Sequence, residues 1–227
     1  MKKTVIFTAL ILTLALSVFA FAACNKDKDN ENKYKGYCFI EKELYVAESD
    51  NFFIELSLVA AESPFIADGK AGELKEFMEL TVYGKGLKDG ARFRFKSEPD
   101  NILGTLKTSL RRGDFTAKFE SAIKLADGLA LEIEVGENHF EEFALTNAMS
   151  GSIGYSAAVE KAREHFAQRF EKEKAENGDA QREIYFRIAR DPHMRGAYYY
   201  FVSFIGSGAD FWSALIDPSD GTVISSN

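Results

Sequence analysis

The sequence predicts a mainly β protein with one α+β unit: an antiparallel β-sandwich, immunoglobulin-like in outline, followed by a helix packed on an antiparallel sheet. Two observations predict this class. Apolar and polar residues alternate with a period of two through most of residues 36–150, as in strands with one buried face. After residue 153 apolar residues recur every three or four positions before alternation returns. The 227 residues, 46% of them hydrophobic, are enough for one or two domains.

The first 24 residues differ from the rest of the chain. Two lysines precede a run of 20 uncharged residues, and a pair of alanines stands directly before Cys24. A basic start, an apolar middle and small residues at the cleavage point are typical of a secretory signal peptide. The segment Phe-Ala-Ala-Cys that ends at Cys24 resembles a bacterial lipobox, with Phe21 where leucine is usual. The resemblance implies that residues 1–24 are a lipoprotein signal peptide and that the Cys24 sulfur is acylated, for example with palmitate.

Two other interpretations of this segment remain open. The uncharged run is about 20 residues long, which is enough to span a bilayer as an uncleaved anchor. Ala20 and Ala22 could also serve a cleavage that releases the chain. The lipid and the anchor interpretations share a consequence, because both place the folded part outside the cytoplasmic membrane and tether it there. We expect a location on the extracytoplasmic face of the cell membrane, with the membrane as a partner through the N-terminal lipid.

Residues 25–35 are expected to form a flexible tether. They read NKDKDNENKYK, without an aliphatic residue, and such a segment cannot bury enough apolar surface to become ordered. Removing the first 24 residues takes away two lysines and no acid, so the net charge changes from −7 to −9. A negative chain argues against nucleic acid as a partner and against electrostatic adsorption to anionic lipid. The lipid alone would therefore hold the protein at the membrane.

The strands expected in residues 36–150 come from alternation. Ile54, Leu56 and Leu58 point one way, and Glu55 and Ser57 point the other way. The same pattern recurs in residues 91–96, 115–119 and 129–135, and Asp-Gly or Arg-Gly-Asp turns separate these runs. Seven or eight short strands in about 115 residues favour a sandwich or a barrel.

The second half is predicted to be a separate domain over residues 153–227, because residues 149–154 are small and rich in glycine. A helix is expected over residues 156–176, with Ser156 as its N-cap and Gly178 at its end. Its apolar stripe is Ala158, Val159, Ala162, Phe166 and Phe170. Strands are expected at residues 183–190, 197–205, 211–216 and 222–224.

A family resemblance emerges from the end of the chain. The expected helix opens with alanines at 158 and 162, and strands follow it. The chain then makes an Asp-x-x-x-Gly turn from Asp217 to Gly221 and ends in a short apolar strand with Val223 and Ile224. Residues 153–227 thereby resemble a PepSY domain. The resemblance implies an interaction or inhibitory role outside the membrane, and it implies no catalytic residues.

The sequence offers no catalytic constellation. It has three histidines, and the zinc-binding pattern HExxH is absent. Glu132 and Glu134 share one strand face, which is expected to be solvated, and Cys38 lies in an apolar run that is expected to be buried. We therefore predict that the protein is not an enzyme and that it has no cofactor and no metal.

Aromatic residues gather between positions 198 and 212. Alternation puts Tyr198 and Tyr200 on one face of a strand and Tyr199 and Phe201 on the other. One helix covers one face, so the second is buried by the first domain, buried by a partner or exposed. The partner-binding candidates are Tyr185, Arg187, Tyr198, Tyr200 and Trp212.

These observations favour a non-catalytic protein-binding or peptide-binding lipoprotein, for example one that restrains an envelope peptidase. The alternative is a lipoprotein that binds a small molecule or an envelope polymer, with aromatic rings stacked on sugars or apolar groups. That alternative predicts a concave aromatic-lined pocket with a few convergent polar groups. A third class, an enzyme that uses carboxylates, would need two acids about 5–10 Å apart in one cleft.

Overall fold

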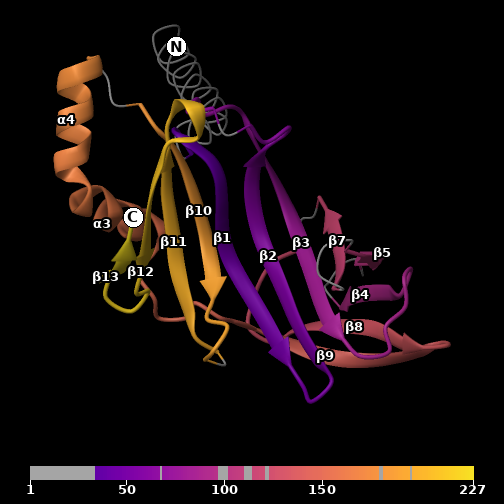
Figure 1. Ribbon diagram of the computed structural model, residues 1–227. Helices are drawn as coiled ribbons and strands as arrows, with labels where there is room; N and C mark the ends of the chain where they lie inside the picture. Colours follow the sequence, from indigo (N-terminus) through magenta and orange to yellow (C-terminus); the bar gives the residue numbers. More distant parts are fainter. Residues whose placement is uncertain are drawn as a thin grey trace, which may run out of the picture. The chain divides into compact units, whose positions relative to one another are not determined.

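A computed structural model describes residues 34–66, 68–96, 102–109, 114–120, 123–178, 181–194 and 196–227. The predicted signal peptide, Cys24 and most of the predicted tether lie outside these residues. Residues 36–227 form one compact unit (Figure 1). Its described part contains 13 strands and two α-helices, so the prediction of a mainly β protein is confirmed. Within the described part, neither helix has the length and apolarity needed to cross a bilayer.

Nine strands follow one another across the main sheet in the order β13-β12-β11-β10-β1-β2-β3-β7-β6. Their bounds are β1 (Tyr37–Glu48), β2 (Phe52–Glu62), β3 (Leu74–Gly84), β6 (Lys107–Thr108), β7 (Phe115–Phe119), β10 (Glu183–Arg190), β11 (Tyr198–Ile205), β12 (Phe211–Ile216) and β13 (Val223–Ser226). The other four are β4 (Arg92–Lys96), β5 (Ile102–Thr105), β8 (Leu129–Gly136) and β9 (His139–Asn147). The helices are α3 (Tyr155–His165) and α4 (Ala167–Asn177), with a short 3-10 turn η1 (Ser207–Ala209).

Strand β1 joins the two halves of the chain. Its first part pairs in parallel with β10, with Ile40 opposite Phe186, and its last part pairs with β9, with Tyr45 opposite Asn147. One sheet therefore runs across the junction predicted near residue 150 and curls back on itself through β9 and β8, so that it is nearly closed like a barrel. A parallel pair needs a long crossover, and here more than 130 residues separate its partners. Local alternation carries no sign of such a pairing.

The hydrophobic core of the first half lies between β1–β3 and β7 on one side and β4, β8 and β9 on the other. Leu56, Leu80, Phe95 and Leu131 are fully buried in it. The alternation expected for residues 54–58 is confirmed, because the apolar set faces this core. On the outer face of β8, Glu132 is only 8% exposed, since it pairs with Arg94 and Lys96 of β4.

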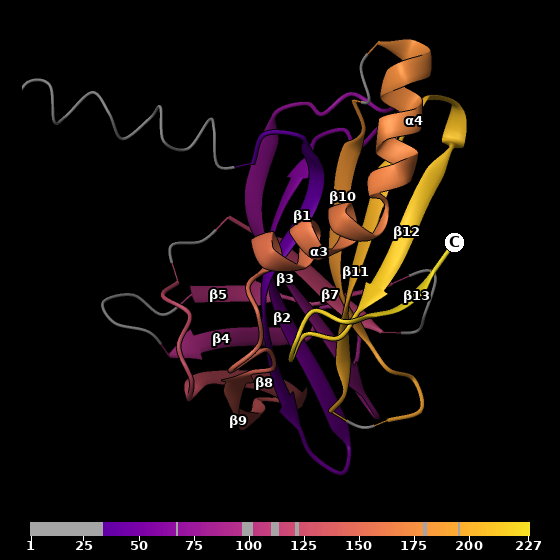
Figure 2. The same ribbon diagram turned by 90° about the vertical axis from the view of Figure 1, so that its left-hand side faces the viewer.

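The two helices cover the same face of the sheet over β10–β12 (Figure 2). The single helix predicted from residue 156 starts instead at Tyr155 and is interrupted at Phe166, whose backbone departs from helical geometry. Phe166 is buried, and Phe170 packs 5.1 Å from the rings of Phe204 and Trp212. The predicted end is confirmed, since Gly178 caps α4 in the left-handed conformation.

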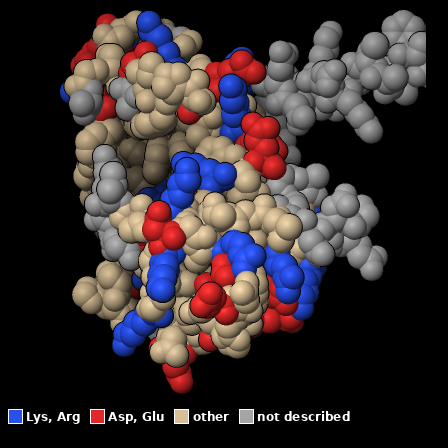
Figure 3. All heavy atoms as spheres, turned by 90° about the vertical axis from the view of Figure 1, so that its right-hand side faces the viewer, with Lys and Arg blue, Asp and Glu red and all other residues tan. Residues whose placement is uncertain are grey.

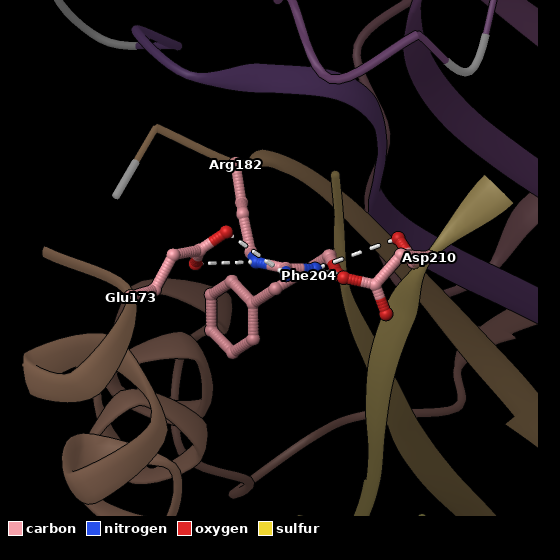
Figure 4. Close-up of polar contacts among 4 residues, drawn as sticks. All are labelled: Glu173, Arg182, Phe204 and Asp210. Carbon is pink, nitrogen blue, oxygen red and sulfur yellow. Dashed lines mark hydrogen bonds and ion pairs between the residues drawn. The ribbon is translucent and has the colours of Figure 1, made fainter. Parts of the chain in front are cut away.

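Arg182 attaches α4 to the sheet (Figure 4). Its guanidinium donates two hydrogen bonds to the Glu173 carboxylate of α4, at 2.8 and 3.0 Å, and pairs with Asp210 beside β12. The same group lies 3.6 Å from the centre of the Trp212 ring. The Arg182 side chain is 4% exposed, so this is a largely desolvated ion pair with a cation–π contact.

Candidate functional site

The face of the main sheet opposite the helices carries a hollow of about 740 Å³, a size typical of ligand sites. Figure 3 shows a recess on this side of the molecule. The hollow is lined by residues of β1, β2, β3, β7, β10 and β11 and of the segments that border them, among them Phe39, Glu41, Ser57, Asp114, Tyr185 and Phe201. We call this cavity the hollow, and the residues that surround it its lining.

Strand alternation supplies the lining. On β10, Ile184, Phe186 and Ile188 are buried, while Tyr185 and Arg187 point to the opposite face. On β1, a bulge lies between Glu41 and Glu43, since Glu41 faces Val59 while Glu43 already faces Leu58. The bulge changes the side to which the residues beyond it point.

One wall of the hollow is aromatic. The rings of Phe39 and Tyr185 stack with centroids 4.7 Å apart and an interplanar angle of 17°. Phe201 of β11 and Phe65 of the loop after β2 each meet Tyr185 edge-on at 6.2 Å. Of these rings, Phe39, Tyr185 and Phe201 line the hollow, and each keeps part of its surface exposed. The wall therefore offers flat apolar surface to a molecule in the hollow.

The floor is polar and already ordered. Glu41 is 6% exposed, and its carboxylate accepts hydrogen bonds from the Ser57 hydroxyl at 2.5 Å and the Ile188 N–H at 3.0 Å. Arg187 Nε lies 3.8 Å from the same carboxylate. Burial raises the pKa of Glu41, and Ser57, Arg187 and Ile188 oppose the rise. Glu41 thus holds Arg187 beside the aromatic wall.

The far wall contributes hydroxyl and carboxylate groups from β3 and β7. Thr81 and Thr116 face each other across these strands, and Lys118 lies 3.5 Å from Glu79. Asp114 is 3% exposed, and within the described part of the chain its Oδ1 has no hydrogen-bond partner. A buried carboxylate oxygen without a donor is costly to the folded chain.

The five residues predicted to bind a partner separate onto two faces. Tyr185 and Arg187 line the hollow. Tyr198 and Tyr200 are instead buried, 8% and 3% exposed, on the opposite face of the sheet. Trp212 lies on that face too, beneath α4. The alternation was predicted correctly, but the face to which the helices bind decides which aromatic residues remain accessible.

Sequence reasoning missed Phe39, Glu41, Ser57 and Asp114. Phe39 stands in the apolar run of residues 37–40, Ser57 on the expected solvent face of residues 54–58, and Asp114 in an expected turn. Strands from distant parts of the chain bring them together. The described residues contain no group of three or more His, Cys, Asp or Glu placed to hold a metal ion. The chemistry that the hollow offers is therefore ring stacking, hydrogen bonding and charge.

Another buried carboxylate outside the hollow lies at the start of β10. Glu183 is 1% exposed, and neither of its carboxylate oxygens has a hydrogen-bond partner of normal geometry among the described residues. Burial raises the pKa of Glu183. The Gly69 N–H opposes the rise, and the carboxylates of Glu62 and Asp68 add to it.

This environment predicts a pH dependence of stability. A carboxyl group whose pKa is higher in the folded chain contributes stability that is complete below its unfolded pKa, about 4.3, and is lost as pH rises through the folded pKa. Relative to wild type, Glu183→Gln should therefore gain free energy of unfolding as the pH rises from about 4 upward. Urea denaturation across this range checks it, with Glu171→Gln on exposed α4 as the control. If the difference in free energy of unfolding between wild type and Glu183→Gln does not change with pH, the assignment is contradicted.

In comparisons with known proteins, no family model, no curated protein and no solved structure matches the chain.

Proposed function

We propose that the chain is a lipoprotein on the extracytoplasmic face of the cell membrane, tethered through acylated Cys24, that binds a ligand in the hollow without catalysing a reaction. The observation that carries the proposal is the hollow itself, about 740 Å³ with an aromatic wall and convergent polar groups. The carboxylate at its floor is engaged by Ser57 and Ile188, which suits a binding role better than proton transfer.

A small molecule or a segment of an envelope polymer is favoured over a folded protein partner. Three of the residues proposed for a protein-binding surface are buried or covered: Tyr198 and Tyr200 are 8% and 3% exposed, and Trp212 packs against Phe166 and Phe170. The aromatic rings left on the open face lie in a concave site. We also keep the PepSY-like assignment of residues 153–227 as a proposal, because α3 and α4 pack on strands β10–β12 as the resemblance implies.

The experiment uses the full chain in detergent micelles with its native lipid. Native mass spectrometry of the protein taken from its own membranes should detect a non-covalently bound ligand. Ala189→Trp, which places an indole in the hollow, should abolish that signal, whereas the same substitution at exposed Ala175 of α4 should keep it. The proposal would be overturned if both variants carried equal amounts of ligand, or if no ligand were detected in the wild type.

The tether gives a separate prediction. Cys24→Ser removes the sulfur that carries the lipid, so radiolabelled palmitate should no longer be incorporated. Cys38→Ser is the matched control, because Cys38 is fully buried and should leave labelling unchanged. Labelling that survives Cys24→Ser would place the lipid on another residue and contradict the assignment of Cys24. A wild-type chain that incorporates no palmitate would contradict the lipoprotein assignment and favour the uncleaved anchor or the released form.

A further inference from the structure

We propose that the ligand of the hollow is an uncharged saccharide, bound through one sugar ring that lies against the aromatic wall. This inference rests on the proposed function, and it names the chemical class that the lining selects. A sugar ring has an apolar C–H face and a rim of hydroxyl groups. The hollow has a matching division into an aromatic side and a side of hydrogen-bonding groups.

The aromatic side is organised before any ligand arrives. Tyr185 is held by the stacked ring of Phe39 and by edge-on contacts with Phe65 and Phe201, so its position is fixed by contacts from three separate segments. Because these rings are only partly buried, apolar surface remains available toward the hollow. A rigid flat surface loses little conformational entropy when a ring packs on it.

The opposite side presents mainly hydrogen-bond acceptors. Glu79, Thr81, Asp114 and Thr116 line this side. Hydroxyl groups of a ligand donate to carboxylates and exchange hydrogen bonds with threonine side chains. A sugar with hydroxyl groups around its ring satisfies several of these acceptors at once.

Other ligand classes fit the lining less well. Four acids and two arginines line the hollow, which disfavours phosphates and other anions. An acyl chain would remove the lining hydroxyl and carboxylate groups of β3 and β7 from water without supplying donors. A cationic peptide would suit the acids, but Arg187 and Arg190 stand in the same lining and would repel it. An uncharged, donor-rich ring avoids each of these costs.

The test is calorimetric titration of the full chain in micelles with neutral hexoses, N-acetylhexosamines and their oligomers, and with an oligolysine peptide. We expect saccharide binding that weakens about tenfold or more in Tyr185→Ala and in Asp114→Asn. Tyr199→Ala is the matched control, since Tyr199 lies on the same sheet face but outside the hollow lining, and it should bind within about twofold of wild type.

The outcomes separate this inference from the proposed function. Binding of single sugars points to a free saccharide, and binding of oligomers alone points to an envelope polymer; both support the inference. Binding of oligolysine but no sugar, lost in Tyr185→Ala, would overturn the saccharide and leave a binding hollow. Sugar binding that survives both hollow variants would overturn the site. Binding of no probe in the wild type, while the membrane-derived protein carries a ligand displaced by Ala189→Trp, would overturn the saccharide alone.

Discussion

Replacing Tyr200 with alanine is expected to lower the free energy of unfolding by about 4 kcal/mol. The side chain is 3% exposed, and its ring lies 5.1 Å from that of Phe186 on the face that α3 covers. Its hydroxyl donates a 2.6 Å hydrogen bond to the Ile153 carbonyl and lies 2.8 Å from the Ser152 hydroxyl. The truncation therefore leaves both a cavity and a carbonyl without its donor.

Urea denaturation of the full chain in micelles measures this loss. Tyr200→Phe separates its parts, because it keeps the packing and should cost about 1 kcal/mol for the hydrogen bond. Tyr185→Ala is the control on the open face of the neighbouring strand, and it should destabilise much less than Tyr200→Ala. Equal losses at the two tyrosines would contradict the assignment of buried and open faces.

Replacing Arg182 with alanine is expected to cost about 3 kcal/mol, the second largest effect. The change leaves Glu173, 20% exposed, without its two hydrogen bonds and removes the cation from the Trp212 ring. Asp210 is 58% exposed and can be solvated, so its lost pairing adds little. The loss should appear first as fraying of α4, because Arg182 connects that helix to the sheet.

Circular dichroism with denaturant and hydrogen exchange at α4 measure the two effects. Arg169→Ala is the matched control, since Arg169 also lies near the Trp212 ring, at 5.9 Å, but is exposed on α4. It should change stability by less than about 1 kcal/mol. Faster exchange in α4 with the control and not with Arg182→Ala would show that the attachment lies elsewhere.

Much of the local structure was predictable from the sequence, and the assembly was not. Alternation placed Ile54 and Leu56 in the core correctly, and Gly178 marked the end of the helical region. The interruption at Phe166 and the parallel pairing of β1 with β10 had no local signal. Each depends on tertiary contacts between residues distant in sequence, so the expected two-domain division did not foresee the continuous sheet.

The candidate site shows the same limit. Tyr185 and Arg187 were predicted because they neighbour an aromatic strand, and they do line the hollow. Tyr198 and Tyr200 were equally aromatic, but the choice between the two faces depends on where the helices pack. Asp114 stood in an ordinary turn-and-strand pattern, and only the pairing of β7 with β3 brings it toward the hollow.

Hydroxyl-radical footprinting tests the central claim, ligand binding in the hollow, most directly. The full chain in micelles is oxidised with and without a low-molecular-mass extract of its native envelope. We expect slower oxidation of Phe39, Tyr185 and Phe201, with no change at exposed Phe211 and Met194. Protection of Phe211 or Met194 with the hollow unprotected, or protection of none of these residues, would contradict the claim.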